Sequence, residues 1–570
     1  KATGERVREL KLKGVYFQKE FKRFYPNKDL AAQVLGYVGT DDTGLGGLEE
    51  KYDHEMHGAP GHMLTAVDAK RHVMNSVERD PQPGENLVLT IDANIQYMAE
   101  RALDAQMAKV KALHGTVVVQ DPHTGQILAL AISPRFDPNA ARHIEPGTLT
   151  NLAVSDVYEP GSTFKLVTYS AALDAAGVEP DDIVDCQGGE MTMDGRTLHD
   201  DASDRGPKDG RMTIERALEI SSDVGAAKMA LKMGPDTFYK YIRSYGFGQR
   251  TGIELPGETR GLLRPPNKWG KTSILSLAIG QEVAVTPIQL VTMVSTIANG
   301  GVYLPPHIVL KETDEAKGNA QLLPAAFHPE YELPAKLPEG AHRVISELTA
   351  AKMRKMMQGV VLDGTGKPAQ LDGYSSAGKT GTAQKVDLVT HTYSHTKVVA
   401  SFAGFAPVSD PAISVTVVID TPTVGSRYGT AVSAPVFAEV AQEVLEYLGV
   451  PHDEPLKTPK ELLAAARSKA QGDAVPTDNI GDLNAMFAAV TALAAADPLR
   501  SAANAAGLNG GSEADTPVAS AASSIAIRDS AKPKEGGAER LLNRLPAKVL
   551  TAFAPNRAGA AAKTVPRAAP

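Results

Sequence analysis

The order of strand-like and helix-like patterns in the middle of the chain constrains its fold more than any other feature. Apolar, β-branched runs stand at both ends of this region, at residues 115–120, 126–133, 398–407 and 413–419, and apolar helical patterns fill the interval. The two early runs are joined by Asp-Pro-His-Thr-Gly, which is a hairpin signature. Strands at both ends with helices between them predict an α+β fold, in which distant segments pair in one antiparallel sheet flanked by helices.

Three further elements can be predicted from their ends. Residues 86–91 read as a strand, and a helix is expected from Asp92, as its N-cap, to about Lys111. A last helix is expected at about 435–448, because it starts at a proline and stops at Gly449.

The texture of the sequence divides the chain into three regions. Residues 1–82 are polar and turn-rich and close on Pro-Gly punctuation, and residues 83–449 carry the regular patterns. Residues 450–570 are rich in alanine, with scattered Pro, Gly and Ser and few aromatics. Such a composition lacks the material for a hydrophobic core, so we expect a disordered, low-complexity tail.

Composition excludes several classes of protein. The chain has 59 basic and 67 acidic residues, a formal net charge of −8, which argues against a dedicated nucleic-acid binder. The single cysteine, Cys186, excludes an intramolecular disulfide framework and any multi-cysteine metal site. No apolar run is long enough to span a bilayer. Because the first residue is Lys1 and not methionine, we expect the front end to have been cut, with the possible loss of an anchor.

The first chemical motif lies in Glu-Pro-Gly-Ser-Thr-Phe-Lys-Leu at residues 159–166. Ser162 is expected on the first turn of an apolar helix, where free backbone amides favour a developing anion. Lys165, three residues on, would lie on the same face and could take the serine proton if it were held neutral. The alternative is an ordinary amphipathic helix, since the same spacing recurs at Ser376 with Lys379 and at Ser394 with Lys397.

The second motif is Ser221-Ser222-Asp223, between two predicted helices. A hydroxyl at a helix junction could contact a lysine and a substrate amide. The alternative is plain helix capping by serine and aspartate.

The third motif is Ala-Gly-Lys-Thr-Gly-Thr-Ala at residues 377–383. Gly381 permits close approach of a ligand to the backbone, Lys379 could pair with a carboxylate, and the hydroxyls of Thr380 and Thr382 add donors. The alternative is an edge strand protected from aggregation by a lysine.

In this order the three motifs match the signature of penicillin-binding proteins and serine β-lactamases. The chain resembles the class B penicillin-binding proteins over roughly residues 10–449, most closely their division-specific, FtsI-like branch, to which residues 224–228 (VGAAK) point. The supporting segments are residues 23–26, 35–36 and 44–49, which resemble a non-catalytic pedestal, and residues 280–281, 286–289, 298–301 and 428–435. The resemblance implies a pedestal in residues 1–82, a transpeptidase domain in residues 83–449 and a tail in residues 450–570.

The resemblance also implies the chemistry. Ser162 would be the nucleophile that attacks the D-Ala–D-Ala bond of a peptidoglycan stem peptide, with Lys165 as general base and Ser221 as proton relay. A second amine would then attack the acyl-enzyme and form the crosslink. Penicillin and other β-lactams would acylate the same serine.

Substrate binding follows from the same resemblance. Lys379 and Thr380, next to Gly381, would hold the terminal carboxylate. The backbone amides of Ser162 and Thr382 would form the oxyanion hole. We expect neither a cofactor nor a metal, and interpret His54 with His57, and His391 with His395, as solvated histidines.

One residue departs from the division branch, which usually has asparagine where this chain has Asp223. A carboxylate near Lys165 would favour the charged lysine and weaken it as a base, unless Lys379 or hydrogen bonds compensate it. Aspartate here is familiar in the elongation-specific branch.

The implied setting is the bacterial inner membrane, with a single N-terminal anchor, the catalytic domain in the periplasm, and a SEDS-family glycosyltransferase and division proteins as partners. The alternatives are an elongation-type transpeptidase, a D,D-carboxypeptidase or β-lactamase on the same scaffold, and a catalytically silent division scaffold.

Overall fold

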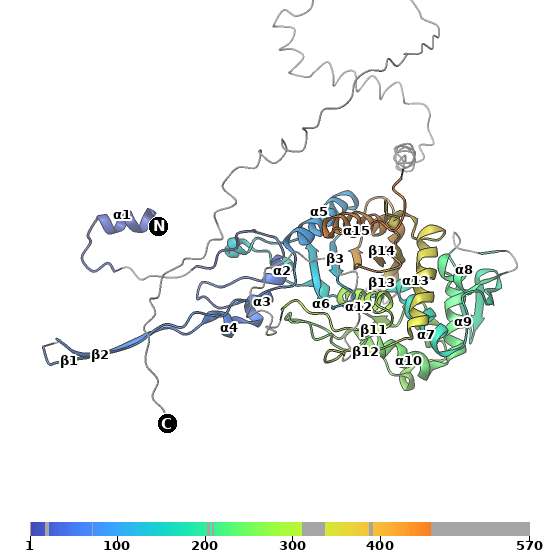
Figure 1. Ribbon diagram of the computed structural model, residues 1–570, viewed down its shortest axis with the longest axis horizontal. Helices are drawn as coiled ribbons and strands as arrows, with labels where there is room; N and C mark the ends of the chain where they lie inside the picture. The colour runs from blue at the N-terminus through green and yellow to red at the C-terminus, as the bar shows by residue number, and fades with distance from the viewer. Residues whose placement is uncertain are drawn as a thin grey trace, which may run out of the picture. The chain divides into compact units, whose positions relative to one another are not determined.

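The computed structural model describes residues 2–16, 22–70, 72–201, 206–207, 210–310, 337–386 and 392–457 (Figure 1). Of the predicted tail, only residues 450–457 belong to this part, and the remainder lies outside the described residues, as does His391. Residues 450–457 follow the last helix and contact residues 83–449, called the catalytic region below because the sequence predicts catalysis there. The Asp453 carboxylate accepts hydrogen bonds from the backbone and side chain of Ser375.

A five-stranded antiparallel sheet forms the centre of the catalytic region. Its order is β13-β14-β15-β3-β4, so strands from the two ends of the region meet at the pair of β15 with β3. In this register Val417 lies between Phe402 on one neighbour and Val117 on the other. The strands are β3 (His114–Gln120), β4 (Ile127–Ser133), β13 (Ala377–Val386), β14 (Tyr393–Ala406) and β15 (Ile413–Asp420). The predicted α+β fold with one antiparallel sheet is confirmed.

Helices cover both faces of this sheet because its strands are apolar on both sides. Val117 and Val119 pack with α5 (Ala93–Val110) and α15 (Ala434–Leu448), whereas Val118, which points to the other face, packs near the fully buried α12 (Pro287–Ala298) (Figure 1). Asp92 caps α5 through the amides of Asn94 and Ile95, as predicted. The last helix also begins and ends as predicted, with proline in its first turn and Gly449 as C-cap.

Six further helices in the described part of the catalytic region lie on the α12 side of the sheet or at its edge: α7 (Lys165–Ala175), α8 (Ile214–Glu219), α9 (Asp223–Met233), α10 (Pro235–Ser244), α11 (Ser273–Ala278) and α13 (Glu347–Leu362). Short strands accompany them: β5 (Ile183–Asp185), β6 (Glu190–Met193), β7 (Arg196–His199), β8 (Arg211–Thr213), β9 (Leu262–Leu263), β10 (Val283–Ala284), β11 (Val302–Tyr303) and β12 (His342–Arg343). These helices and short strands enclose a second large apolar core, which surrounds α7. The short helix α14 (Gly429–Val432) packs with α15 instead.

The front of the chain forms a small unit of short elements. These are α1 (Ala2–Glu9), α2 (Ala32–Leu35), α3 (Gly47–Lys51), α4 (Asp53–His57) and the antiparallel pair β1 (His62–Val67) and β2 (Val73–Arg79). Its contacts with the catalytic region are apolar as well as polar. Val34 and Leu48 belong to the same buried cluster as Val118 and Ile127 of the central sheet. The Ala31 amide donates to Glu100 Oε1 at 2.9 Å, and the Gln33 side chain donates to two backbone carbonyls.

One predicted strand is wrong. Residues 86–91 form no ladder, and Leu89 makes only an isolated bridge with Val309. The apolar pattern is real, because Leu89 packs against a buried cluster. Backbone hydrogen bonds with Ile308 and Leu310 flank its bridge, but no longer ladder forms among the described residues.

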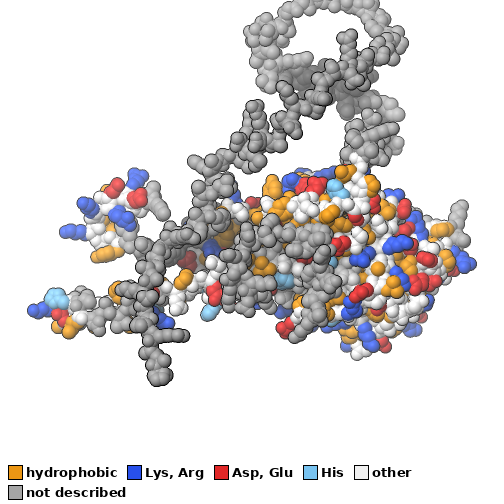
Figure 2. Space-filling model, viewed as in Figure 1, with side chains coloured by type: hydrophobic (Ala, Val, Ile, Leu, Met, Phe, Trp, Pro, Cys, Tyr) orange, Lys and Arg blue, Asp and Glu red, His pale blue; other side chains and the backbone are white. Residues whose placement is uncertain are grey.

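The charges on the surface are mixed. On the face shown in Figure 2, acidic and basic side chains alternate over the described residues and form no basic patch of the kind that binds nucleic acid. None of the described helices combines the length and apolarity needed to cross a membrane.

Candidate active site

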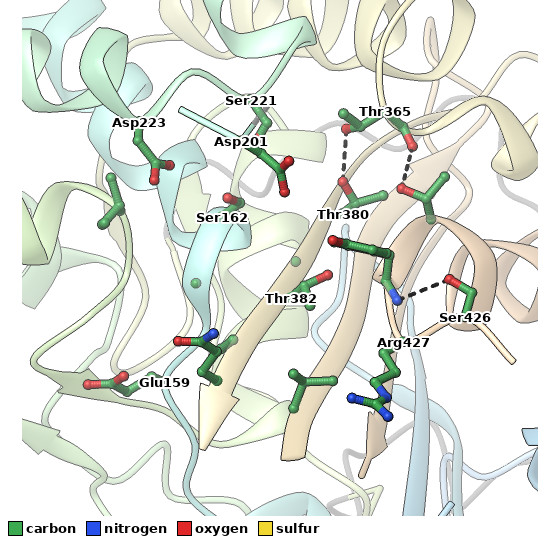
Figure 3. A pocket seen from close by; sticks show the side chains of 18 of the residues that line it. Glu159, Ser162, Asp201, Ser221, Asp223, Thr365, Thr380, Thr382, Ser426 and Arg427 are labelled. Carbon is green, nitrogen blue, oxygen red and sulfur yellow. Dashed lines mark hydrogen bonds between the residues drawn. The ribbon is translucent and has the colours of Figure 1, made fainter. Parts of the chain in front are cut away.

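A cavity of about 660 Å³ opens beside the edge strand β13 and collects residues from all three sequence motifs. Ser162 lies between Ser221 and Asp223 on one side and Thr380 and Thr382 on the other (Figure 3). These residues are separated by up to 220 positions in the sequence, so the fold brings the motifs together.

Ser162 lies in a 3₁₀ turn, Gly161–Phe164, that runs directly into α7. The predicted helix therefore begins one turn later than expected, and Lys165 is its first residue. The turn is packed closely: Gly161 has φ +55°, its amide donates to the Gly280 carbonyl at 3.2 Å, and a side chain at Gly280 would collide with the Gly161 carbonyl. Such packing fixes the backbone on which Ser162 stands.

Lys165 is completely buried, and its ammonium faces the second motif. Its Nζ donates to the carbonyl oxygen of Ser221 and, at 3.1 Å, to Ser221 Oγ, and it forms an ion pair of 2.5 Å with Asp223 Oδ1. Among the described residues, Lys165 Nζ donates no hydrogen bond to Ser162 Oγ. Catalytic hydrogen bonds are often unformed without substrate, so this geometry is that of a resting site.

The second motif forms the junction between α8 and α9. Ser222 is the N-cap of α9, as its Oγ accepts from the Gly225 amide at 2.9 Å, so part of the capping alternative is correct. Ser221 has φ +62°, a left-handed conformation that is uncommon for a residue with a side chain. The ion pair joins Asp223 to Lys165 itself, so the cation nearest to this carboxylate is the lysine of the first motif and not Lys379.

The third motif runs along the edge strand, as expected, but Lys379 does not protect that edge. Its side chain is completely buried, and its Nζ donates to the carbonyl of Thr380 at 3.1 Å, so the alternative of a solvent-exposed lysine is wrong. Gly381 is needed for space, because a Cβ there would lie 2.5 Å from Ser401 Oγ and 2.9 Å from the Pro160 carbonyl. β13 can therefore lie against the turn that carries Ser162.

Two threonine hydroxyls of β13 are held by residues outside the motif. Thr380 Oγ1 is 2.8 Å from Thr365 Oγ1, and Thr382 Oγ1 accepts from the Gly429 amide at 3.0 Å. Gly429 belongs to the segment 428–435 that the sequence singled out, whereas nothing in the sequence distinguished Thr365.

Several other cavity residues were not predicted as site residues. Among them are Gln281 and five that are labelled in Figure 3: Glu159, Asp201, Thr365, Ser426 and Arg427. Burial raises the pKa of the Glu159 carboxyl, an effect opposed by hydrogen bonds from the Glu282 amide and from the Tyr393 hydroxyl. Glu159 and Gln281 lie in segments that the sequence singled out, but nothing there gave these two side chains a role. The other four follow no spacing that a single sequence makes visible.

His54 and His57 do not line this cavity. Both are exposed on α4, and the backbone of His395 belongs to β14. Within the described ranges there is no group of three or more His, Cys, Asp or Glu side chains that could hold a metal ion. Cys186 is buried in the core around α7, as a packing residue would be.

A serine beside a buried lysine, a second serine on that lysine and an edge strand rich in donors form a site for acyl transfer through a serine ester. The comparisons agree with this class. The family model described as penicillin binding protein transpeptidase domain matches residues 115–442, and the penicillin-binding protein dimerisation domain matches residues 3–89. The chain belongs to the class B penicillin-binding proteins, a family of serine acyltransferases.

Named relatives extend over most of the chain. Stage V sporulation protein D of Bacillus subtilis is 35% identical over 79% of this chain and 68% of its own length. Peptidoglycan D,D-transpeptidase FtsI of Escherichia coli is 30% identical over 78% of this chain and 71% of its own. Penicillin binding protein 3 of Mycobacterium tuberculosis, solved in complex with aztreonam, has a TM-score of 0.63 and 31% identity and covers 76% of this chain and 92% of that structure. The predicted family, fold and enzyme class are confirmed.

Proposed function

We propose that this chain crosslinks peptidoglycan stem peptides through an acyl-enzyme on Ser162. The observation that carries the proposal is the convergence of Ser162, Ser221, Thr380 and Thr382 on one cavity, with Lys165 buried directly behind it. In the first half-reaction Ser162 Oγ attacks the carbonyl carbon of the penultimate D-alanine, and its proton passes to a neutral Lys165. The C–N bond breaks, and Ser221 relays a proton to the departing D-alanine. An amine of a second stem peptide then attacks the ester and releases Ser162.

Substrate would be held along β13. The hydroxyls of Thr380 and Thr382, with Lys379 as the buried positive charge behind them, suit a terminal carboxylate. The amides of Ser162 and Thr382 are the candidate oxyanion donors, because both belong to cavity residues on rigid backbone. Gly381 keeps the strand free of a side chain where the substrate would pair with it.

The ion pair of Lys165 with Asp223 requires one additional step. An ammonium cannot accept the serine proton, and a carboxylate at 2.5 Å favours the ammonium. Asp223 is 26% exposed at its side chain, so a bound stem peptide would exclude water from it. Loss of that water penalises both charges, and the proton can then pass from Lys165 to Asp223, which leaves a neutral base beside a neutral acid.

We assign the chain to septal wall synthesis, with FtsI as the supporting relative. Peptidoglycan lies outside the cytoplasmic membrane, so we place the catalytic domain in the periplasm of the cell, held by a single N-terminal anchor. A SEDS-family glycosyltransferase and other division proteins are the partners of this proposal. The test is depletion of this protein from its cells. Cells that grow into filaments would support the septal role, whereas cells that become round would support an elongation role.

The test of the chemistry is the fate of the acyl group. The purified chain is given a donor peptide ending in D-Ala–D-Ala together with a D-amino acid as acceptor, and the products are separated by mass spectrometry. We expect release of D-alanine with transfer to the acceptor, loss of both in Ser162→Ala, and retention of both in Ser394→Ala, the matched serine of an unrelated Ser-x-x-Lys tetrad. Hydrolysis alone would indicate a D,D-carboxypeptidase, loss of a penicillin adduct within seconds a β-lactamase, and no reaction at all a silent scaffold.

A further inference from the structure

Asp200 is a buried carboxylate that directly follows β7 and touches the second motif, although it belongs to none of the three motifs. Only 3% of the residue is exposed, and it does not line the cavity. Its Oδ2 accepts from Ser222 Oγ at 2.8 Å, and its Oδ1 accepts from the amides of Asp223 at 2.6 Å and Val224 at 2.9 Å. We propose that Asp200 is a positioning residue for acyl transfer, which holds Ser221 and Asp223 against Lys165; this rests on the function proposed above.

The contacts explain why a carboxylate stands here. The first amides of an α-helix have no partner within the helix, and its N-terminus favours negative charge. At the start of α9 the Ser222 hydroxyl takes the Gly225 amide, and Asp200 takes the two amides before it. Asp200 also accepts a hydrogen bond from the same Ser222 hydroxyl. One buried anion therefore fixes the side chain and the backbone of the motif together.

The hydrogen bonds of Asp200 also restrain Ser221, the residue before Ser222, whose backbone conformation is strained. Ser221 occupies the left-handed region at φ +62°, and in that conformation both its carbonyl and its hydroxyl face Lys165 Nζ. A residue with a side chain stays in this region only where its surroundings hold it. On one side the amides of Ser221 and Ser222 are bonded back to α8, at the carbonyls of Leu218 and Ala217. On the other side the holding contacts are those of Asp200.

The same stretch of chain also reaches the cavity wall. Asp201, the next residue, lines the cavity. Arg196, at the start of β7, donates to Gln281 Oε1 at 2.9 Å, and Gln281 is another lining residue. The backbone of Asp200 is anchored independently, because its amide donates to the Gly189 carbonyl at 2.8 Å. The segment from Arg196 to Asp201 thus links the rim of the cavity to the second motif.

A simple helix cap is the competing explanation, and the chain contains a matched control for it. Asp92 caps α5 through two backbone amides, at 2.8 and 3.1 Å, and lies outside the cavity. Substitution of either aspartate removes a carboxylate cap from a helix. Only substitution of Asp200 is expected to alter the placement of Ser221.

The experiment measures acylation by fluorescent penicillin over a range of label concentrations. Two quantities are determined: the rate constant at saturating label, and the label concentration that gives half of that rate constant. We expect Asp200→Ala to lower the rate constant by about 10- to 100-fold, as displacements of about 1 Å do, with the half-saturating concentration little changed. Asp200→Asn, which keeps an oxygen for the two amides, should show a smaller reduction than Asp200→Ala, of about threefold. Asp92→Ala should lower the melting temperature, as expected of a lost cap, whereas Asp92→Asn should leave it nearly unchanged because asparagine also caps helices. Both Asp92 variants should leave the rate constant within about twofold.

The outcomes separate this inference from the proposed function. If the wild-type chain takes up label but Asp200→Asn and Asp200→Ala react at the wild-type rate, the inference is overturned and the function stands. If Asp200→Ala does not fold, Asp200→Asn and Ser222→Ala decide, with a rate reduced at least about threefold expected for both, since each loses a buried hydrogen bond to a charged group. An unlabelled wild-type chain would overturn the function and the inference together.

Discussion

Replacement of Asp223 by asparagine is expected to lower the free energy of unfolding. Asparagine keeps an oxygen that can accept from Lys165 but removes the charge that lies 2.5 Å from Nζ. Because Lys165 is completely buried, its ammonium then loses the charge that compensates its burial. The folded state should therefore be destabilised relative to the unfolded chain, in which water solvates both side chains.

The size of the effect follows from the distance and the exposure. Two unit charges 2.5 Å apart interact by about 2 kcal/mol at the dielectric constant of water and by about 7 kcal/mol at an effective value near 20. Because Asp223 is 26% exposed and both charges lose hydration in the pair, we adopt the lower part of this range, about 1.5–3 kcal/mol. The free energy of unfolding should fall by this amount.

The assay is urea-induced unfolding at neutral pH, with the free energy of unfolding extrapolated to water. Asp236→Asn is the matched control, because Asp236 occupies the first turn of α10 and is exposed to solvent. It should change the free energy of unfolding by no more than about 0.5 kcal/mol, as a surface substitution would. An unchanged free energy of unfolding in Asp223→Asn would refute the coupling of the two side chains.

Two further predictions concern packing and stability around the site. A Cβ at Gly225 would lie 2.8 Å from the buried hydroxyl of Tyr169, which has no hydrogen-bond partner among the described residues. Gly225→Ala should therefore lower the free energy of unfolding by about 1–3 kcal/mol, and adding Tyr169→Phe should restore most of the loss in thermal melts. Equal melting temperatures for the single and double variants would contradict this. Burial acts to raise the pKa of Asp174, but hydrogen bonds from Ser346, Tyr241 and a threonine hydroxyl together hold it below its ordinary value. A carboxyl whose pKa is lower in the folded than in the unfolded chain stabilises the fold at pH values above its unfolded pKa, and this stabilisation is lost as the pH falls. Asp174→Asn should therefore lower the melting temperature at pH 7 and differ less from wild type below about pH 4. A difference in melting temperature that stays constant with pH would contradict this.

The sequence was sufficient to predict the elements whose ends carry local signals. Asp92 marks the start of α5, Gly449 marks the end of α15, and the β-branched runs form the sheet. The prediction of a strand at residues 86–91 was wrong, because strand pairing depends on a partner elsewhere in the chain, and of these residues only Leu89 forms a bridge.

The candidate site was predictable to the extent that its residues stand in motifs. Spacing singled out Ser162, Lys165, Ser221 and Lys379, and the resemblance suggested a carboxylate of Asp223 near Lys165. The ion pair between the two side chains could not be predicted, since that contact depends on how two helices pack. Asp200 was not predicted for a similar reason: its three side-chain hydrogen bonds reach 22 to 24 residues along the chain and follow no helical or strand period.

The most direct test of the account is to locate the covalent adduct formed by a β-lactam on the intact chain. The protein is incubated with penicillin, digested and sequenced by mass spectrometry, and the adduct is followed in time. The account predicts a single modified residue, Ser162, in the turn before α7, with an adduct that persists for many minutes and is absent in Ser162→Ala. An adduct on Ser221, Ser376 or Ser394, or one that disappears within seconds, would contradict it.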